Sequence, residues 1–425
     1  MNTKALRQKI LDLAIHGKLV PQDPNDEPAS VLLERIRDEK ERLIKEGKIK
    51  RPKKTKTTSD KPHYENVPFE VPSSWGWCKL HDIIQITNGR SQKDVENVNG
   101  KYPIYGSGGI IGKAVEYLCE AGSTIIGRKG TINNPLFVEE RFWNIDTAFG
   151  MKPMYAISDL YFFYFCQYFD FSKLDKSTAV PSLTQSAIGE VFIPIPPINE
   201  QKHITDGISY WFGFIDTLES NLNNLQLTIK QTKSKILDLA IHGQLVPQDP
   251  TDEPASELLK RINPKAEITC DNGHYQKLPE GWAVCCLENV AKVLDNLRKP
   301  INSNERNSRI ANKHENELFP YYGATGQVGF IDDYLVDGTF LLLGEDGAPF
   351  LDKYAIKSYP IKGKCWVNNH AHILDPQCDF DYLIYYLNHV DYKDYVNGST
   401  RLKLTQSDMR SIIILLPPLT EQHIS

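Results

Sequence analysis

The sequence KILDLAIHGKLVPQDPNDEPASVLLERI at residues 9–36 recurs almost unchanged as KILDLAIHGQLVPQDPTDEPASELLKRI at residues 235–262. Agreement over this length is no accident, so the chain contains an internal duplication. Each copy begins with a helical pattern and continues through an extended, Pro-containing turn. A second short helix follows, predicted at about 29–47 and 255–262. The chain therefore alternates helical segment, domain, helical segment and domain.

The similarity between the halves continues in weaker form through the segments that follow each long repeat. The matching pairs keep the same order: VPSSWGWCKL (71–80) with LPEGWAVCCL (278–287), YPIYGSGGIIG (102–112) with FPYYGATGQVG (319–329), WNIDTA (143–148) with WVNNHA (366–371), SLTQ (182–185) with KLTQ (403–406), and IPIPPINEQ (193–201) with ILLPPLTEQ (414–422). Between these anchors the halves differ in length and residue. One frame that carries two different surfaces suits a protein that reads two unrelated targets at a fixed separation.

A long helix with a heptad pattern is predicted after the first domain. Its apolar residues recur in steps of four and three with one polar interruption, as at the a and d positions of a coiled coil. At about 1.5 Å per residue the patterned part is roughly 54 Å long. A long helix buried inside one compact domain is the alternative, but a strict two-per-seven pattern favours a partner helix. The predicted contact residues are Ile204, Ile208, Trp211, Ile215, Leu218, Leu222, Leu225, Ile229, Ile236 and Leu239.

Each domain is predicted to mix strands and helices. Short runs rich in β-branched and aromatic residues alternate with Gly, Asn and Pro, and one aromatic helical stretch occurs in each half, at 159–169 and 380–390. We therefore expect the α+β class, with two mixed α/β domains in pseudo-twofold tandem, separated by long antiparallel coiled-coil helices. The expected boundaries are 1–62 for an N-terminal helical segment and basic linker, 63–197 for the first domain, 198–273 for the spacer and short helix, 274–418 for the second domain, and 419–425 for the start of a second spacer helix.

Loops that combine glycine with a cation, an amide or a hydroxyl occur at matching places in both domains. Arg and Lys donate to guanine edges, Asn and Gln pair with adenine, and glycine lets the backbone approach a phosphate. An ordinary surface turn is the alternative for each loop taken alone. The candidate DNA-contacting residues are Arg90, Lys93, Tyr105, Ser107, Arg128, Lys129, Lys176 and Ser177 in the first domain, and Arg298, Lys299, Tyr322, Thr325, Asn369, His370, Arg401 and Lys403 in the second.

The composition limits the class of protein. A formal net charge of -5 would not by itself suggest a DNA-binding protein, so any basic surface is expected in patches or on partner subunits. The basic run at residues 48–56 is predicted to be a solvated linker, with phosphate contact as the alternative. The eight cysteines show no C-x-x-C pair and are expected to be buried thiols. Without a long apolar run or an export signal, the chain is expected to be cytoplasmic.

Catalytic motifs do not emerge from the sequence. The Pro-Pro pairs IPPI (195–198) and LPPL (416–419) lack the acceptor and aromatic of an amino-methyltransferase tetrapeptide. The run SGGIIGKA (107–114) has Ser107 in place of the first glycine of a phosphate loop and Ala114 in place of the magnesium-binding hydroxyl. We therefore predict neither catalytic nor metal-binding residues in this chain.

The repeated KILDLAIHG-x-LVPQDP-x-DEPAS segment, the YG-x-x-G-x-x-G loops, the LTQ segments and the PP-x-x-EQ helix entries together resemble the specificity subunits of type I restriction-modification systems. The resemblance covers nearly the whole chain. It implies a subunit without catalysis or bound cofactor, whose two target-recognition domains each read one half of a bipartite, asymmetric double-stranded DNA site. It also implies two modification subunits that use S-adenosylmethionine, and restriction subunits that use ATP and magnesium.

Two other classes of function remain open at this stage. One is a coiled-coil scaffold or adaptor with duplicated interaction domains and no DNA reading; the other is a stand-alone nuclease or methyltransferase with an unfamiliar site. A structural expectation accompanies the resemblance, since the second PPLTEQ is followed only by His423, Ile424 and Ser425. The N-terminal helix should pack antiparallel on the first third of the long helix, leaving Leu218 to Leu239 exposed or facing another chain.

Overall fold

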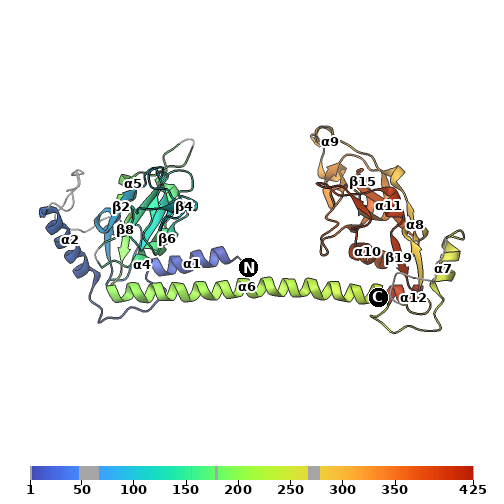
Figure 1. The fold of residues 1–425 in the computed structure, drawn as a ribbon, viewed down its shortest axis with the longest axis horizontal. Coiled ribbons are helices and arrows are strands. Elements are labelled where there is room, and N and C mark those ends of the chain that lie inside the picture. Colours follow the sequence, from blue (N-terminus) through green and yellow to red (C-terminus); the bar gives the residue numbers. More distant parts are fainter. Residues whose placement is uncertain (1, 47–66, 155, 178–179, 267–277, 425) are drawn as a thin grey trace. The chain divides into compact units, whose positions relative to one another are not determined.

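The computed structural model describes residues 2–46, 67–154, 156–177, 180–266 and 278–424. The chain divides into two compact units, Met1–Leu222 and Asn223–Ser425. The helix α6 (Ile198–Ile241) begins in unit 1 and ends in unit 2 (Figure 1). The predicted α+β class, with two repeated domains joined by a long helix, is therefore confirmed. The finer domain boundaries stay predictions.

Unit 1 combines a small number of helices with short strands that are mostly antiparallel, with β3 and β7 as a parallel pair. Its strands form a four-stranded sheet in the order β2-β8-β5-β6, a three-stranded sheet in the order β4-β3-β7, and the pair β1-β9. The elements are α1 (Thr3–Ile15), α2 (Ala29–Lys45), β1 (Gly76–Lys79), α3 (Leu80–Ile83), β2 (Ile84–Asn88), β3 (Tyr102–Gly106), β4 (Gly109–Ala114), β5 (Ser123–Gly127), β6 (Leu136–Val138), β7 (Trp143–Asn144), β8 (Ala148–Pro153), α4 (Asp159–Tyr168), η1 (Phe171–Leu174), α5 (Gln185–Gly189) and β9 (Phe192–Ile195).

Unit 2 repeats this order with a different sheet. One long strand, β15, pairs with β14 along Ser358–Cys365 and then with β12 through Trp366 and Val367, so a single six-stranded sheet replaces the two of unit 1. The elements are α7 (Ala255–Ile262), β10 (Ala283–Cys286), α8 (Leu287–Val290), β11 (Ala291–Val293), η2 (Asp295–Leu297), α9 (Ser303–Ile310), η3 (Glu315–Glu317), β12 (Phe319–Gly323), β13 (Gly326–Ile331), β14 (Val336–Gly344), β15 (Ser358–Val367), β16 (Ala371–Pro376), α10 (Phe380–His389), β17 (Val396–Asn397), β18 (Lys403–Leu404), α11 (Gln406–Arg410), β19 (Ile413–Leu416) and α12 (Leu419–Ile424).

The same closing pair of strands frames both domains. In unit 1, β1 lies antiparallel to β9 with Gly76 opposite Ile195, and in unit 2, β10 lies antiparallel to β19 with Ala283 opposite Leu416. The two aromatic stretches form the predicted helices, α4 and α10, and one buried tyrosine of each, Tyr161 and Tyr382, contacts these strands. The hydroxyl of Tyr161 donates to the Pro194 carbonyl at 2.8 Å. Each domain therefore begins and ends on neighbouring strands next to one aromatic helix.

The repeated motifs meet at one buried carboxylate in each unit. In unit 1 the indole N–H of Trp75 donates to Glu200 Oε2 at 2.9 Å, and the Gln22 amide donates to Glu200 Oε1 at 3.1 Å. In unit 2 Trp282 and Gln248 donate to Glu421 at 2.9 and 3.0 Å. The LVPQDP, P-x-x-W and PP-x-x-EQ motifs recur because they make one hydrogen-bonded joint between the helical segment, the domain and the next helix.

Helix α1 lies against the first part of α6 in the opposite direction. Arg7, near the start of α1, pairs with Asp216 at 2.5 Å and with Glu219 at 3.4 Å. Further along the chain, Gln22 reaches Glu200 near the start of α6. Because the residue order is reversed on the two segments, the packing is antiparallel, as predicted (Figure 1).

The predicted a and d residues of α6 fall into three groups. Ile204 and Ile208 are buried, at 0% exposure each, within the core that includes α1 and α4, and Ile215 is buried at 3%. Leu218 and Leu239 are half-buried. The exposed members are Trp211 (44%), Leu222 (41%), Leu225 (56%), Ile229 (46%) and Ile236 (46%). The expectation of exposed apolar residues beyond Leu218 thus holds in part, and contact with a partner helix stays a prediction.

Trp211 differs from its neighbours in the heptad pattern. Its ring contacts those of Tyr210 and Phe214, and Phe212 rather than Trp211 packs against the core, with the Arg7 guanidinium 5.0 Å from the centre of its ring. The side of α6 that meets α1 is therefore displaced by one residue here. The packing of Phe212 against the core and its contact with Arg7 determine which residue of α6 faces α1. The spacing of apolar residues in the sequence does not predict this.

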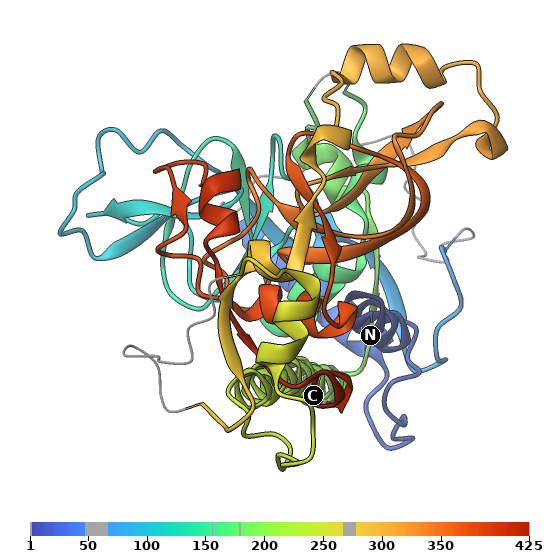
Figure 2. The same cartoon turned by 90° about the vertical axis from the view of Figure 1, so that its right-hand side faces the viewer.

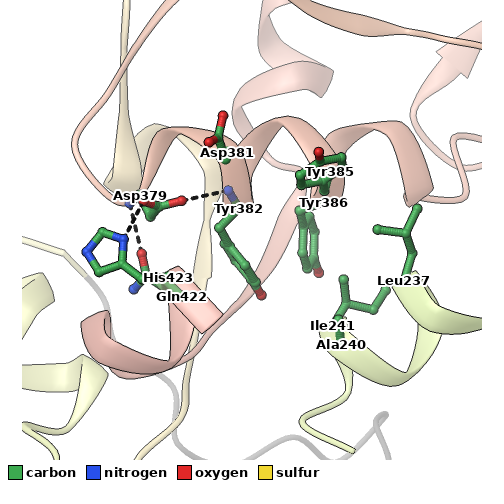
Figure 3. Close-up of a pocket in the computed structure, with 10 residues that line it drawn as sticks. All are labelled: Leu237, Ala240, Ile241, Asp379, Asp381, Tyr382, Tyr385, Tyr386, Gln422 and His423. Atoms are coloured by element: carbon green, nitrogen blue, oxygen red, sulfur yellow. Dashed lines mark hydrogen bonds and ion pairs between the residues drawn. The ribbon is translucent and has the colours of Figure 1, made fainter. Parts of the chain in front are cut away.

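A hollow in unit 2 lies where the end of α6, α10 and α12 meet (Figure 3). His423 pairs with Asp379 at 2.8 Å at its rim, and Tyr385 on its wall is 56% exposed. Figure 2 shows α6 nearly end-on with α12 at its side. In unit 1 the corresponding tyrosine, Tyr164, is only 8% exposed, since its hydroxyl lies 3.0 Å from the hydroxyl of Ser209 on α6.

Three further expectations concern the cysteines, the basic run at 48–56 and membrane-spanning helices. Five of the seven cysteines in the described ranges are buried, and Cys286 and Cys378 are partly exposed; Cys270 lies outside those ranges. The basic run at 48–56 also lies outside the described residues. Of the helices that the structure describes, none has the length and hydropathy needed to span a bilayer.

Candidate nucleic-acid interface

Three of the predicted loops of unit 1 meet residues 144–148 at one edge of the strands. The backbone N–H of Arg90 donates to the Asn144 carbonyl at 3.0 Å, and the N–H of Arg128 donates to the Thr147 carbonyl at 2.7 Å. The loop after Lys176 joins them, because the N–H of Leu183 donates to the Arg128 carbonyl at 2.9 Å. The loops therefore form one surface, which we call the unit 1 loop cluster, comprising residues 88–93, 127–131, 144–148, 176–177 and 180–183.

Glycines hold these loops and the β3–β4 hairpin close together. A Cβ on Gly89 would lie 1.7 Å from the Ile145 carbonyl oxygen, so only glycine fits there. A Cβ on Gly127 would lie 3.2 Å from the Cβ of Ser107, which places the hairpin tip beside the 127–131 loop. The glycines that the sequence analysis associated with phosphate approach thus also serve the packing of loop against loop.

Unit 2 brings its own loops together through the same backbone contacts. The N–H of Lys299 donates to the Val367 carbonyl at 3.0 Å, the N–H of Glu345 donates to the His370 carbonyl at 2.8 Å, and the N–H of Leu404 donates to the Glu345 carbonyl at 2.8 Å. The tip of the β12–β13 hairpin lies beside them, since a Cβ on Gly344 would lie 2.9 Å from the Ala324 carbonyl oxygen. The unit 2 loop cluster comprises residues 295–299, 344–347, 367–371 and 401–406.

These shared backbone contacts fix which residues of the two clusters correspond. Trp143 donates its indole N–H to the Arg90 carbonyl and Trp366 donates to the Lys299 carbonyl, so Arg90 and Lys299 are equivalent. The strand registers extend the correspondence to further positions. The equivalent pairs are Asn88 with Asp295, Arg128 with Glu345, Lys129 with Asp346, Phe149 with His372, Ser182 with Lys403, and Gln185 with Gln406.

The cations of the unit 1 cluster are exposed and stand apart from carboxylates. Arg90, Lys93, Lys129 and Lys176 are exposed, and Arg128 is half-buried with its guanidinium 5.9 Å from the centre of the Phe149 ring. Over the described part of the chain none of these five cations has a carboxylate oxygen within 4.0 Å. Their donors are therefore available to an external acceptor.

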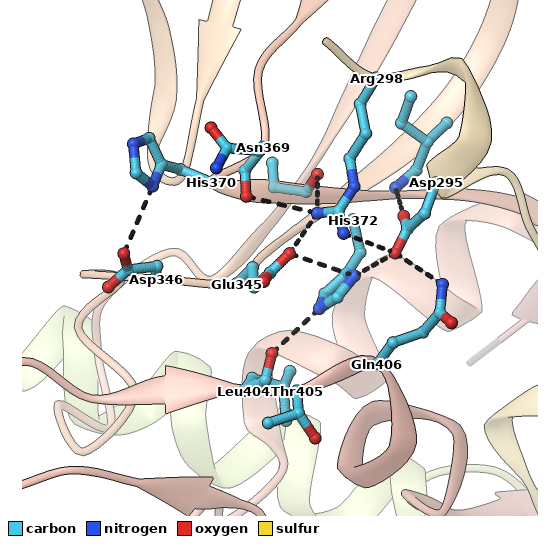
Figure 4. A network of polar contacts seen from close by, with 12 residues as sticks. Asp295, Arg298, Glu345, Asp346, Asn369, His370, His372, Leu404, Thr405 and Gln406 are labelled. Atoms are coloured by element: carbon cyan, nitrogen blue, oxygen red, sulfur yellow. Dashed lines mark hydrogen bonds and ion pairs between the residues drawn. The ribbon is translucent and has the colours of Figure 1, made fainter. Parts of the chain in front are cut away.

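Three of the four lysine and arginine side chains of the unit 2 cluster have carboxylate partners, and Figure 4 shows the network around Arg298. Lys299 is exposed and has no ion pair within the described part of the chain. The Arg298 guanidinium contacts Glu345, lies 3.1 Å from Asp295, and also donates to the Ala371 carbonyl at 3.2 Å. Lys403 pairs with Glu345 at 3.2 Å. A second pair outside this group joins Arg401 to Asp346 at 2.5 Å. In unit 2, three predicted DNA-contacting cations thus have carboxylate partners within the same cluster.

A buried histidine joins the two sides of the network. His372 is 0% exposed, with Nδ1 2.7 Å from Asp295 Oδ2 and Nε2 3.0 Å from the Leu404 carbonyl oxygen. Burial by itself raises the pKa of Asp295, but the hydrogen bond and charge of His372, the Ile373 N–H and Arg298 outweigh it and lower that pKa. Asp295 is consequently held as a carboxylate at the base of the loops.

Asp295, Glu345 and His372 are close enough together to suggest a metal site, since their ligand atoms lie within 4.8 Å of one another. Arg298, however, reaches both carboxylates and already supplies a positive charge there. A divalent ion in place of the guanidinium would leave Arg298 without a carboxylate partner. We therefore interpret the group as an ionic network rather than a metal centre.

The remaining predicted residues occupy different environments. Tyr105 and Tyr322 are half-buried, and burial raises the pKa of both phenols. The Ser177 hydroxyl donates to Asp175 at 2.6 Å within its own turn. Ser107 is half-buried at one hairpin tip, whereas Thr325 at the other is exposed, as is Asn369. Each lies in or beside a loop cluster, and DNA contact by these residues stays a prediction.

Sequence reasoning missed the acidic half of the unit 2 cluster. Asp295, Glu345, Asp346, His372 and Gln406 were not singled out, although they organise the loops there. A signal was present, because the strand endings STIIGRKG (123–130) and FLLLGEDG (340–347) align on their glycines. That alignment sets an acidic pair opposite a basic pair.

Comparison with known proteins agrees with this geometry. The family model described as type I restriction modification DNA specificity domain matches residues 72–227 and 279–425. The specificity subunit of the type I restriction enzyme EcoAI from Escherichia coli is 29% identical over 385 residues, covering 69% of this chain and 63% of the relative. That of EcoEI, also from Escherichia coli, is 27% identical over 377 residues, covering 69% and 62%.

This chain thus spans somewhat less than two thirds of the length of these relatives. A solved structure from work on complex assembly and conformational transition of the type I R-M system shares the fold, with a TM-score of 0.52, 15% identity, and coverage of 84% of this chain and 89% of that one. The two family-model matches together cover more than half of the sequence and fall on the two repeated domains. The protein belongs to the family of type I restriction-modification DNA specificity subunits.

Proposed function

We propose that each loop cluster of this chain reads one half of a bipartite, asymmetric DNA site. The observation that carries the proposal is the pairing of two clusters with the same backbone frame and different side chains. Because the same backbone contacts hold both clusters, each cluster has the same orientation relative to its own strands. Because the side chains differ at equivalent positions, the two half-sites should differ in sequence.

Helix α6 is proposed to set the distance between the half-sites. It is continuous over 44 residues, which corresponds to about 66 Å at about 1.5 Å per residue. This length is comparable with two turns of B-DNA at about 34 Å each. A helix that carries one domain at each end fixes a spacing in a way that an unstructured linker would not.

Catalysis is proposed to belong to partner subunits. In the proposed complex, which acts in the cytoplasm, two modification subunits bind S-adenosylmethionine and methylate adenine, and restriction subunits use ATP and magnesium to cleave DNA. This chain would bind none of these cofactors and would supply sequence recognition. The network of Asp295, Glu345 and His372 supports a non-catalytic role, since its polar groups are engaged with one another.

The decisive experiment is to purify the chain with its cognate modification subunits and map the adenines they methylate. Two short sequences separated by a constant gap are expected among the modified positions. Methylation without a common sequence, or the same motif on both sides of the gap, would contradict the proposal. Absence of methylation together with absence of DNA binding would favour a coiled-coil adaptor.

A further inference from the structure

The two loop clusters differ in charge at equivalent positions. The basic pair Arg128-Lys129 of unit 1 stands where unit 2 has the acidic pair Glu345-Asp346, and both pairs follow the last residue of a central strand. Both pairs also meet the strand-like segment that precedes LTQ, through the bridges Lys129–Ser182 and Asp346–Lys403. The charge reversal therefore occurs within one conserved frame.

The reversal changes what the neighbouring cations can do. In unit 1, Lys129 is exposed and Arg128 is half-buried, and among the described residues neither has a carboxylate within 4.0 Å. In unit 2, Glu345 is only 8% exposed and engages both Arg298 and Lys403, while Asp346 engages Arg401. A cation that already has a carboxylate partner must give up that partner before it neutralises a phosphate.

The unit 1 cluster also has acidic side chains near it, but they lie differently. Asp94 and Asp146 are exposed, and neither has an ion pair in the described part of the chain. Asp175 accepts hydrogen bonds from the Ser177 hydroxyl and from the backbone N–H groups of Ser177 and Ser182. These carboxylates therefore leave the arginine and lysine donors of the cluster open.

We propose that unit 1 supplies most of the salt-dependent attraction for the DNA backbone, and that unit 2 docks with three of its four cluster cations, all but Lys299, already neutralised by Glu345 and Asp346. The inference rests on the proposed function. Counterion release follows the number of phosphates that free cations neutralise, so the salt dependence should be concentrated on unit 1. Unit 2 would contribute hydrogen bonds from groups such as Asn369, which depend less on salt.

The test uses the complex with its modification subunits and a labelled mixed-sequence duplex, whose binding is measured between about 50 and 200 mM salt. The slope of log K against log salt is negative. Arg128→Gln and Lys129→Gln should each reduce the magnitude of this slope by about 0.9, the value for one phosphate contact. Arg401→Gln and Lys403→Gln should reduce it by less than half as much. Lys260→Gln on α7, outside both clusters, is the control for loss of a surface charge.

A reciprocal variant makes the comparison independent of lost contacts. Asp346→Asn releases Arg401. It should increase the magnitude of the slope and tighten binding of the duplex at low salt. Equal losses of slope from the two units, or an unchanged slope with Asp346→Asn, would overturn the inference while site-specific methylation persists. A complex that binds no duplex at all would overturn the proposed function as well.

Discussion

At the scale of single residues, the strongest determinant of the repeated fold is a buried glutamate. Glu200 is 1% exposed and accepts from both Trp75 and Gln22, and Glu421 does the same for Trp282 and Gln248. A buried donor that loses its acceptor costs about 1–3 kcal/mol. Conservation of both motifs between the halves thus follows from one shared hydrogen-bonding requirement.

Glu200→Ala should lower the free energy of unfolding of unit 1 by about 1–3 kcal/mol, because the buried indole N–H of Trp75 loses its acceptor. Denaturant unfolding followed by tryptophan fluorescence measures the loss. Glu219→Ala, on the same helix but in a surface pair with Arg7, is the control and should cost at most about 1 kcal/mol. Equal losses for the two variants would show that the joint does not stabilise the unit.

A second residue-scale prediction concerns Asp82, which joins α3 to α2. Burial by itself raises the pKa of Asp82, but hydrogen bonds and charge from His81 and Lys40 lower it to about 2. A depressed pKa stabilises the fold above the ordinary value of 3.8, and that contribution is lost as the pH falls toward about 2. Partial exposure reduces its size to about 1 kcal/mol.

Asp82→Asn should therefore be less stable than the natural chain at neutral pH, and the difference should shrink below pH of about 4. Urea midpoints measured from neutral to acidic pH follow this change. Asp94→Asn, which removes an exposed carboxylate, serves as the matched control. A difference between Asp82→Asn and the natural chain that stays constant with pH would rule out the proposed cause.

Residue types could be predicted for part of the candidate site only. Arg128 and Lys129 stood out because cations beside glycines suggest phosphate contact. Glu345 and Asp346 did not stand out, because acidic residues indicate against DNA binding when the sequence of each domain is considered by itself. Their role depends on Arg298, Arg401 and Lys403, which are brought near them by strand pairing between distant segments.

At the scale of elements, loop-against-loop packing limits which glycines can change. Gly89→Ala should destabilise unit 1 by about 1–3 kcal/mol, since the added methyl group meets the Ile145 carbonyl. Gly108→Ala at the tip of the β3–β4 hairpin has nothing within 4 Å of the added atom and is the control. Thermal unfolding compares the two, and a stable Gly89→Ala chain would contradict the packing of these loops.

The aromatic helices α4 and α10 offer a matched pair of truncations. Tyr164 is 8% exposed and contacts Phe212 and Ser209, whereas the equivalent Tyr385 is 56% exposed. Tyr164→Ala should cost about 3–5 kcal/mol, the usual range for a buried aromatic side chain. Tyr385→Ala should stay within about 0.5 kcal/mol in the 425-residue chain. A large loss at Tyr385 would mean that this side chain is covered in solution.

Elements were predicted well where periodicity was long, and less well where pairing is distant. Helices α4, α6, α7 and α10 follow from apolar spacing, and Ser158 and Asp379 cap the starts of α4 and α10. The replacement of two short strands, β6 and β7, by the single strand β15 does not follow, because strand continuity depends on partners far away in sequence. The exposure of Trp211 beside the packed Phe212 was missed for a similar reason.

Across the whole molecule, each domain begins and ends on two strands that pair with each other. The chain enters the domain of unit 1 through β1 and leaves it through β9, which pairs with β1, and the domain of unit 2 repeats this with β10 and β19. Segments whose ends lie close together exchange with little strain on the rest of the fold. The shared frame therefore predicts that one domain can replace the other.

A chimera in which residues 283–416 replace residues 76–195 should fold, since Gly76 opposite Ile195 and Ala283 opposite Leu416 provide the same junction. With its modification subunits it should methylate a site in which the unit 1 half has been replaced by the unit 2 half. Mapping the methylated adenines tests this, with the natural chain as control. An unchanged site from a folded chimera would show that recognition does not depend on the loop clusters, because the exchanged segment contains every residue of the unit 1 cluster.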